Sequence, residues 1–448
     1  MSHCILLASA LIGAAVGDEI RVGVASRDIT PEGAIWLSGY SARDHASDGV
    51  AQRLVASAAA FDDGHDRFVV IALDNCEVSR KCSAPFLEEV QKKHGLPPDA
   101  VVIVSSHSHS APCLEGVLEG MFAFEGVEKE RVERYTNQLR ADLVELVGAA
   151  LADLRPASLA RGEGTAGFAM NRRIYREDRV DFGENPIGPV DERVPVLRVT
   201  GPDGAIRAIL FGYACHGTTI AGDDFYKVSG DYMAYAREHI EAVFPGAKAL
   251  YLTGCGADTN PSPRGSLQFA RQHGLELAGA VAGVLNRPLR PVVGPIRRAF
   301  ERLELPLAPP PDRAKLVADA DAKDKYVRNR ARAWLALLDS GKPLPATVSF
   351  PTSVVRLGDE LTFFFLGGEP VVDYALAIQS RFAADRPWTV GYAYEVPCYI
   401  PSQRILKEGG YEADSSLIYY GIYGPILGRA EEMILGKIAE LVQKTRGK

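Results

Sequence analysis

The sequence predicts an α/β fold with layered, mixed β-sheets, flanking helices and a single large domain. Segments with a helical spacing of apolar residues alternate with short apolar runs through the middle of the chain. The turn residues Pro202-Asp203-Gly204 separate two apolar runs and predict an antiparallel hairpin. With 448 residues, 47% of them hydrophobic, the chain can bury a large core. We therefore expect mixed sheets rather than purely parallel ones.

These patterns assign elements along most of the chain. Strands are predicted at residues 19–25, 52–61, 67–73, 101–104, 191–200, 205–214, 248–253, 347–357, 360–366 and 388–393. Helices are predicted at residues 83–94, 128–154, 231–244, 265–285, 314–338, 370–381 and 425–444. A proline-rich stretch precedes the charged helix at 314–338, so residues 306–342 are the best candidate for an internal insertion. The charged side chains of that helix are interpreted as a solvated face.

The composition argues against nucleic acid as a partner. The formal net charge is −7, and no basic tract or interleaving of arginine with aromatic residues occurs. After residue 17, no stretch is apolar and long enough to predict a membrane span. The pattern does not select an oligomeric state.

A small-residue apolar run at the start of the chain suggests export. The run covers residues 4–17 and ends in Ala15-Val16-Gly17, which resembles a signal-peptide cleavage site. Only His3 precedes it in place of the usual basic region, so a wrongly chosen start or a first core strand remains an alternative. We expect residues 1–17 to be a signal peptide and the protein to be secreted or periplasmic.

Cysteine usage allows two interpretations. Without Cys4, six cysteines remain, and six can form three disulfides whose pairing the sequence does not select. No CxxC spacing occurs, so a cysteine-rich structural zinc site is not indicated. Cys215, Cys255 and Cys398 lie in or beside apolar runs, which favours buried, small hydrophobic side chains.

Two histidines directly follow a predicted strand. The β-branched run at 101–104 leads through two serines into His107-Ser108-His109. Residues two apart in an extended segment point the same way, so both imidazoles could face one point in space. Neutral imidazole nitrogen is a ligand that zinc accepts. Taken alone, the pair is explained equally well by two solvated loop histidines.

Polar side chains also follow three other predicted strands. They are His216, Asp258-Thr259-Asn260, and Glu369 after the pair Gly367-Gly368. Ligands of open α/β sheets bind beyond the carboxyl ends of the strands. The imidazoles of His107, His109 and His216 with the Glu369 carboxylate would make a hydrolytic metal site. Taken singly, His216 could be a core histidine and Glu369 a carboxylate at a helix N-terminus.

Seven motifs in a fixed order carry a resemblance to a known family. They are residues 23–31, His107 to Pro112, Asn171-Arg172, the strand before His216, Ser229-Gly230-Asp231 with Tyr235-Ala236, Gly368-Glu369, and Tyr399-Ile400 with Tyr411-Glu412-Ala413 and Tyr420-Gly421. From about Val22 to Leu427 the chain resembles the catalytic, N-terminal domain of the neutral/alkaline non-lysosomal ceramidase family. The resemblance implies that residues 18–448 form this domain, without the family's C-terminal immunoglobulin-like domain.

The resemblance also implies a set of zinc ligands. These are His107, His216, Glu369 and Tyr399. Tyrosine is an uncommon zinc ligand, and without the family Tyr399 would be interpreted as an aromatic residue beside a turn. By the same resemblance, His109, Arg172 and Tyr411 line the reaction centre. Arg172 and a tyrosine hydroxyl would stabilise an oxyanion, and His109 would pass a proton to the leaving amine.

One catalytic position departs from the family pattern. The family serine that is implicated in catalysis aligns with Asn260. An amide cannot act as a nucleophile, although it can donate a hydrogen bond to an oxyanion or to substrate. The serine-nucleophile mechanism is therefore doubtful here, whereas zinc-activated water remains possible.

Three functional hypotheses follow. The first is a zinc-dependent amidohydrolase that cleaves the N-acyl bond of a ceramide-like or smaller substrate. The second is a metal-dependent esterase or another metallohydrolase on the same scaffold, which Asn260 motivates. The third is a non-catalytic binding protein that keeps the zinc as a structural element. No long exposed apolar segment for bilayer docking is evident, which favours a smaller or more polar amide than a membrane sphingolipid.

Overall fold

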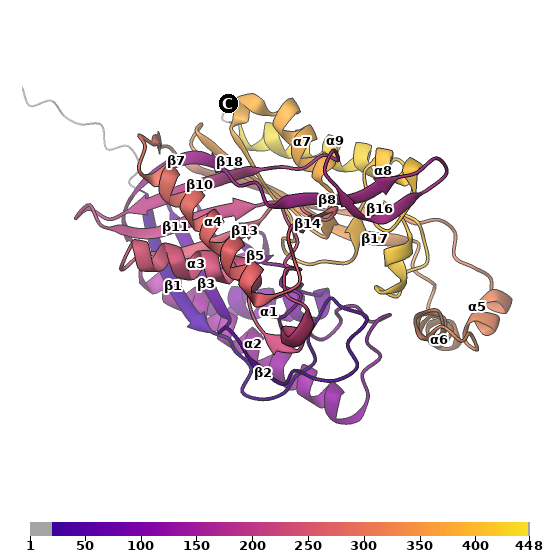
Figure 1. Ribbon diagram of the computed structural model, residues 1–448. Helices are drawn as coiled ribbons and strands as arrows, with labels where there is room; N and C mark the ends of the chain where they lie inside the picture. Colours follow the sequence, from indigo (N-terminus) through magenta and orange to yellow (C-terminus); the bar gives the residue numbers. More distant parts are fainter. Residues whose placement is uncertain (1–19, 447–448) are drawn as a thin grey trace, which may run out of the picture.

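A computed structural model describes residues 20–446 and confirms the α/β class, with mixed sheets and flanking helices (Figure 1). The first sheet has the order β5-β4-β3-β1-β6. Its strands are β1 (Arg21–Asp28), β3 (Val55–Asp62), β4 (Arg67–Leu73), β5 (Val101–Ser105) and β6 (Arg155–Pro156). β4 and β5 are parallel, and the other pairs are antiparallel. Helices α1 (Arg80–His94) and α2 (Gly126–Ala152) bury their apolar stripes on this sheet.

The second sheet has the order β13-β11-β10-β7-β15. Its strands are β7 (Ser158–Thr165), β10 (Arg193–Thr200), β11 (Ile206–Tyr213), β13 (Lys248–Thr253) and β15 (Arg290–Val292). β10 and β11 form the predicted antiparallel hairpin, and β13 lies parallel to β11. Helices α3 (Asp231–Val243) and α4 (Leu267–Leu285) cover one face.

The third sheet has the order β16-β17-β18-β20. Its strands are β16 (Ile296–Pro306), β17 (Thr347–Leu357), β18 (Leu361–Leu366) and β20 (Pro387–Val390). Helices α7 (Val372–Arg381) and α9 (Ala430–Thr445) pack on it. Val70, Leu210 and Phe363, one from each of the three sheets, belong to a single buried apolar cluster. The three sheets therefore share one core, and the helices lie on their outer faces.

Shorter elements complete the described part of the chain. The strands are β2 (Gly49–Val50), β8 (Ala169–Tyr175), β9 (Val180–Asn185), β12 (Lys227–Val228), β14 (Thr259–Pro261), β19 (Glu369–Pro370) and β21 (Tyr399–Ile400). The helices are α8 (Gln403–Glu408) and single turns of 3₁₀ helix at Pro98–Ala100, Gly222–Asp224, Ala383–Asp385 and Ser415–Ile418. Two of the small sheets, β14-β8-β9 and β19-β21, carry residues of the candidate site.

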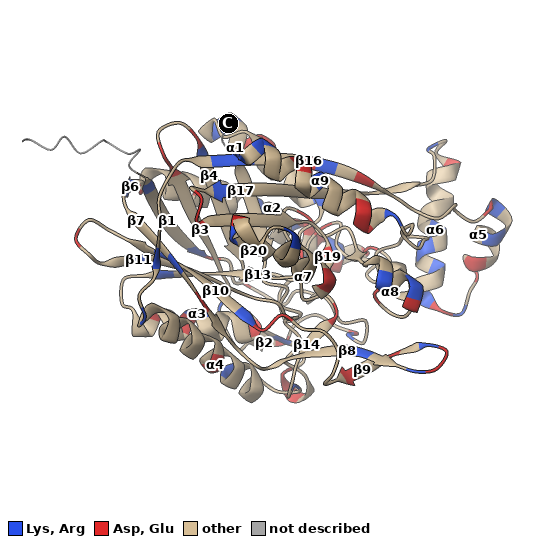
Figure 2. Cartoon of the chain, turned by 90° about the horizontal axis from the view of Figure 1, so that it is seen from above, with Lys and Arg blue, Asp and Glu red and all other residues tan. Residues whose placement is uncertain are grey.

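The charged segment between β16 and β17 forms two helices rather than the single one expected. They are α5 (Arg313–Asp319) and α6 (Lys325–Asp339), and they project from one edge of the molecule, with acidic and basic residues along both (Figures 1 and 2). The Asp324 side chain accepts hydrogen bonds from the N–H groups of Tyr326 and Val327. This N-cap starts α6 as a separate helix. The single helix predicted at 314–338 is therefore divided into α5 and α6.

Strands β7, β8 and β9 were not predicted, because their sequence lacks a clear apolar alternation. Gly162 and Gly164 occupy β7 where α4 approaches the sheet closely. A β-carbon on either glycine would lie within 3 Å of a methyl group of Val284. The apolar contact of this strand is thus supplied by the helix, and the strand itself contributes small residues.

Three further expectations concern the signal peptide, membrane-spanning helices and cysteine pairing. The predicted signal peptide, residues 1–17, lies outside the described residues. Between residues 20 and 446, no helix is long and apolar enough to cross a membrane. Cys76, Cys82, Cys113, Cys215, Cys255 and Cys398 are all buried and unpaired. The small-hydrophobe interpretation is therefore the one that the fold supports.

Candidate metal centre

The candidate site lies where strands from all three sheets end close together. A β-bridge joins Ser108 to Gly217, so the loop after β5 runs beside the loop after β11. A second bridge joins Val104 to Ala393, three residues after β20. The segments that follow β5, β11 and β20 therefore lie together.

Two of the predicted metal ligands are brought together by backbone pairing. β19 and β21 are parallel, and Glu369 lies opposite Tyr399 in their register. Glu369 leaves β18 through Gly368, whose φ of +71° is a conformation that favours glycine. Helix α7 begins three residues later, at Val372, so the alternative role of Glu369 as a helix N-terminal carboxylate is wrong.

The donor atoms of the four predicted ligands converge. His107 Nε2 lies 3.1 Å from Glu369 Oε2, and His216 Nε2 lies 3.2 Å from the same oxygen. The Tyr399 hydroxyl oxygen is 3.2 Å from His216 Nε2. All four side chains are buried, with no more than 3% of any residue exposed.

These separations fit a small tetrahedral cation. Zinc binds nitrogen and oxygen at about 2.0–2.1 Å, so two ligand atoms of a tetrahedral site are about 3.3 Å apart. The separations His107–Glu369, His216–Glu369 and His216–Tyr399 are 3.1, 3.2 and 3.2 Å. Two imidazoles, a carboxylate and a phenol are also ligands that a borderline metal accepts.

The hydrogen bonds of the imidazoles support the same interpretation. His107 Nδ1 lies 2.9 Å from the Cys76 carbonyl, and His216 Nδ1 lies 2.8 Å from the Gly256 carbonyl. A carbonyl only accepts, so each Nδ1 carries a proton and Nε2 is the ring nitrogen left for a metal. Both Nε2 atoms face the carboxylate of Glu369, so one cation placed among them would contact all three side chains. Such carbonyl partners are typical of metal-binding histidines.

The charges of the site also favour a cation. Burial alone would raise the pKa of Glu369, but the adjacent imidazoles of His107 and His216 hold it well below its usual range. Burial lowers the pKa of His216 to about 3, helped by the nearby Arg172 charge. The carboxylate is therefore ionised and His216 is neutral, which are the protonation states that bind a metal.

His109 lies beside the predicted ligands, but alternation along an extended strand does not place it there. Its Nε2 is 3.2 Å from His107 Nε2. The segment is not extended, because His107 has a φ of +62°, in the left-handed region. A local turn, and not strand alternation, therefore directs both rings to the site. Gly39 packs against the His109 ring so closely that a β-carbon there would lie 2.3 Å from Nδ1.

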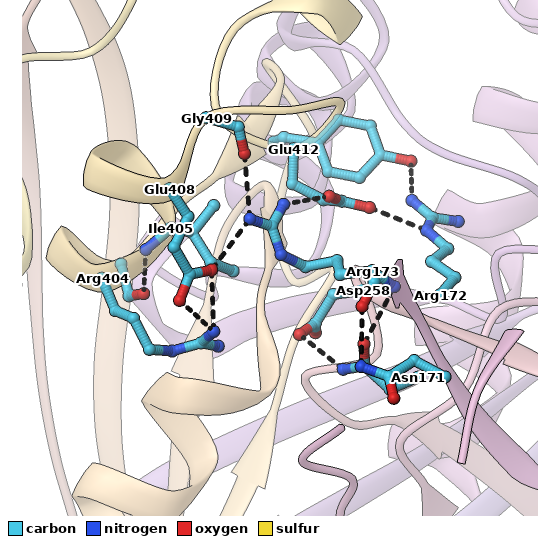
Figure 3. Close-up of polar contacts among 12 residues, drawn as sticks. Asn171, Arg172, Arg173, Asp258, Arg404, Ile405, Glu408, Gly409 and Glu412 are labelled. Atoms are coloured by element: carbon cyan, nitrogen blue, oxygen red, sulfur yellow. Dashed lines mark hydrogen bonds and ion pairs between the residues drawn. The ribbon is translucent and has the colours of Figure 1, made fainter. Parts of the chain in front are cut away.

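Arg172 reaches the site from strand β8 and is held by a buried ion pair (Figure 3). Its Nε donates to Glu412 Oε1 at 2.9 Å, and its Nη2 donates to the Tyr399 hydroxyl at 3.0 Å. The other carboxylate oxygen of Glu412 accepts from Arg173 at 2.7 Å. Burial works to lower the pKa of Arg172, but Tyr399 and Glu412 raise it well above its ordinary value. The guanidinium therefore stays charged.

Asn260 lies in β14, next to Arg172. Its Oδ1 accepts hydrogen bonds from Arg172 Nη1 at 3.2 Å and from the Thr218 hydroxyl at 3.1 Å. With its oxygen occupied by these two donors, the amide nitrogen is the part of the side chain left to donate. This orientation agrees with the hydrogen-bonding role expected from the sequence.

A small pocket gives access to the centre. Its empty volume is about 260 Å³, and it is lined by Gly39, Cys76, Glu77, His107, His109, Leu118, Met121, Glu369, Tyr399, Tyr411, Tyr419 and Tyr420. The predicted residue Tyr411 belongs to this wall, with its ring 5.4 Å from that of Tyr399. The Arg172 guanidinium lies 5.5 Å from the Tyr411 ring centroid. All eight predicted site residues are thus near one another.

Sequence reasoning gave no role to three side chains that hold the site. Glu412 pairs with Arg172, Tyr420 donates a hydrogen bond to Glu369 Oε1, and the Tyr392 ring packs 4.4 Å from that of His107. Glu412 and Tyr420 lie in motifs shared with the family, so their positions were visible but their partners were not. Tyr392 lay in a predicted strand and has a φ of +52°, which no local pattern indicates.

The geometry defines a buried histidine–carboxylate–tyrosine centre at the strand ends of an α/β fold. Residues 20–255 match the family model described as neutral/alkaline non-lysosomal ceramidase, N-terminal. Because this match covers more than half of its length, the chain belongs to that family.

Two solved structures share the fold. One is described as neutral ceramidase from Pseudomonas aeruginosa, with 17% identity, a TM-score of 0.72, and coverage of 95% of this chain and 74% of that chain. The other is described as a ceramidase complexed with C2, with 16% identity, a TM-score of 0.72, and coverage of 96% and 76%. No curated protein matched in the sequence comparison.

Proposed function

We propose that this chain is a zinc-dependent hydrolase that cleaves the N-acyl amide bond of a ceramide-like or smaller substrate. The convergence of His107, His216, Glu369 and Tyr399 carries the proposal. Membership of the ceramidase family supports the reaction class. The small pocket, with its tyrosine and aliphatic walls, supports an acyl group as the part of the substrate that enters.

The chemistry assigns a task to each remaining side chain. Hydrolysis places a hydroxyl group on the acyl carbon, breaks the C–N bond and gives the leaving nitrogen a proton. A bound zinc would supply the positive charge that lowers the pKa of a water molecule and polarises the acyl oxygen. Arg172 and the Tyr411 hydroxyl would stabilise negative charge on that oxygen. Burial keeps the pKa of His109 well below its ordinary value, so its neutral ring can carry the proton to the nitrogen.

Metal analysis is the first test. Purified protein should contain about one zinc per chain, and His216→Ala should lose most of it, because the substitution removes a buried ligand that the Gly256 carbonyl orients. His94→Ala is the matched control, since His94 is a half-buried histidine at the end of α1 whose Nε2 contacts the Val144 carbonyl of α2. Zinc content unchanged in His216→Ala would overturn the proposed centre.

The substrate class is tested on a panel. Zinc-loaded protein should hydrolyse N-acyl amides, and a chelator should abolish the activity. Asn260 favours one competing function, because a site without the family serine could be limited to esters, whose leaving groups depart more easily. Hydrolysis of esters or phosphoesters with no amide turnover would establish this second function. A zinc-loaded protein that is inert on the whole panel would indicate a structural metal.

Export is a separate part of the proposal and rests on the apolar run at residues 4–17. Full-length protein expressed in a bacterial host should be recovered from the periplasm or medium. Its first residue should then be Asp18 by N-terminal sequencing. Retention in the cytoplasm with an intact start would contradict the proposal.

A further inference from the structure

One wall of the pocket is made by a loop that does not belong to any sheet. Tyr419 and Tyr420 line the pocket, together with Leu118 and Met121. Tyr420 donates a hydrogen bond to Glu369 Oε1, and the Met121 N–H donates to the Tyr419 carbonyl at 3.0 Å. The position of residues 419–423 therefore sets how far this wall lies from the reaction centre.

Helix α6 of the projecting hairpin holds that loop from behind. Trp334 Nε1 donates to the Gly421 carbonyl at 2.7 Å, and Arg330 Nη1 donates to the Ile422 carbonyl at 2.9 Å. The Arg330 guanidinium also lies 3.8 Å from the ring centroid of Tyr423. Trp334 is 3% exposed, so this contact is part of the packed structure and not a surface encounter.

The same helix also holds the other side of the pocket. The Tyr326 hydroxyl donates to the Ser41 carbonyl at 2.9 Å, and its ring meets that of Tyr419 edge-on at 5.1 Å. The loop that contains Ser41 carries Gly39 and Tyr40, which both pack against the ring of His109. Helix α6 therefore joins the two walls of the pocket.

The pocket itself is small. Its empty volume is about 260 Å³, and this figure includes space at its open side. Leu118 and Met121 are at most 7% exposed, so other residues of the fold cover the apolar part of the wall. A long acyl chain would have to displace the loop at 419–423, and with it the contacts to α6.

We infer that the substrate is an N-acyl amide with a short acyl group, and that the α5–α6 hairpin sets the upper limit on acyl length. This inference rests on the proposed function, whose site it deepens. Tyr326 and Trp334 are the positioning residues, because each fixes a pocket wall through a backbone carbonyl without touching the metal ligands. Loosening both should admit longer chains.

The test is a rate series on zinc-loaded protein with acetyl, butanoyl, octanoyl and hexadecanoyl amides of one amine. In the wild type, kcat/KM should fall at least about tenfold from butanoyl to hexadecanoyl, since a fixed wall excludes the extra methylenes. In the double variant Y326F/W334F, which loses two hydrogen bonds and keeps an aromatic ring at each position, the difference should shrink to about threefold. Arg313→Ala is the control, because Arg313 pairs only with exposed Asp339 within the hairpin.

A binding series separates the two proposals. Calorimetry with butanoate, octanoate and hexadecanoate measures acyl length preference without turnover. Preference for the short acids in a protein that cleaves no amide would leave the limit on acyl length standing while the proposed amidase function fails. Hexadecanoyl compounds cleaved or bound as well as butanoyl ones would overturn the inference, as would a wild-type profile in a folded Y326F/W334F protein. If the melting temperature of the double variant lies well below that of the wild type, Tyr326→Phe alone gives the same comparison.

Discussion

Arg172 shows how much of this site depends on single buried contacts. Its three nitrogens donate to Glu412, Asn260 and Tyr399, so no other orientation of the guanidinium satisfies the same partners. Tyr399 in turn contacts His216 Nε2. Direct hydrogen bonds thus connect the Glu412 carboxylate, through Arg172 and Tyr399, to the metal centre. Glu412 itself contacts neither a metal ligand nor the pocket.

Glu412→Gln should therefore impair catalysis through Arg172. The substitution keeps the shape but leaves Arg172 and Arg173 buried without their shared negative charge, at a cost of about 3–5 kcal/mol in the free energy of unfolding. We expect kcat on the best N-acyl amide to fall by about tenfold to a hundredfold with zinc content retained. Steady-state kinetics, zinc analysis and urea unfolding measure the three quantities.

Glu408→Gln is the matched control for this prediction. Glu408 also pairs with Arg173, but its side chain is 26% exposed and it does not contact Arg172. Its loss should change kcat by less than about twofold, and stability by less than about 1 kcal/mol. Equal effects of the two substitutions would show that Arg172 has no special dependence on Glu412.

At the scale of elements, the shortest strands position the centre. β19 and β21 have two residues each, yet their register places Glu369 opposite Tyr399. The approach of β19 depends on Gly368, whose backbone is left-handed and packed against Ile400 and Cys398. A tight turn directly after β18 is what turns the Glu369 carboxylate toward the histidines.

Gly368→Ala should destabilise this pairing. A β-carbon would lie 2.5 Å from Ile400 Cγ1 and 2.9 Å from the Cys398 carbonyl oxygen, in addition to the strain of a positive φ. We expect a loss of about 2–4 kcal/mol in the free energy of unfolding, measured in urea, together with weaker zinc retention. Gly436→Ala in α9 is the control, because its β-carbon would meet nothing within 4 Å and should be neutral or stabilising. Equal stability of the two variants would contradict the structural role given to Gly368.

At the scale of the whole molecule, three sheets that share one core meet at the site. This convergence buries charged groups that the unfolded chain leaves in water, so stability depends on pH. Asp258 accepts a hydrogen bond from the Val372 N–H at 2.8 Å, at the start of α7. Burial raises the pKa of Asp258 from 3.8 to about 7, against the lowering effect of that bond.

The substitution Asp258→Asn tests whether the contribution of Asp258 to stability falls or rises with pH. Between about pH 4 and 7 the folded chain keeps a proton that the unfolded chain has lost, so the contribution of Asp258 to stability falls as the pH rises. An amide does not titrate. The difference in free energy of unfolding, Asp258→Asn minus wild type, should thus increase by about 1–3 kcal/mol from pH 5 to pH 8. Urea unfolding of both zinc-free proteins measures it, and a gap that is constant with pH would contradict the prediction.

Strong local patterns explain which elements were predictable. The hairpin of β10 and β11, the strand β13 and the helices α2, α3 and α4 have clear apolar periodicity, and the structure confirms them within a few residues. The small strands β8, β14, β19 and β21 have none, because their partners rather than their composition hold them in place. Arg172, Asn260 and Tyr399 all lie on these small strands, and two of the three entered the prediction only through the family resemblance.

The sequence by itself determined the fold class, the strand exits at His107, His216 and Glu369, and the family, since these depend on periodicity and on short motifs within the chain. Only the tertiary structure decided that Tyr399 lies opposite Glu369, that Glu412 holds Arg172, and that α6 joins the two pocket walls. These contacts link residues far apart along the chain. Their geometry comes from the packing of three sheets on one core, which no local pattern encodes.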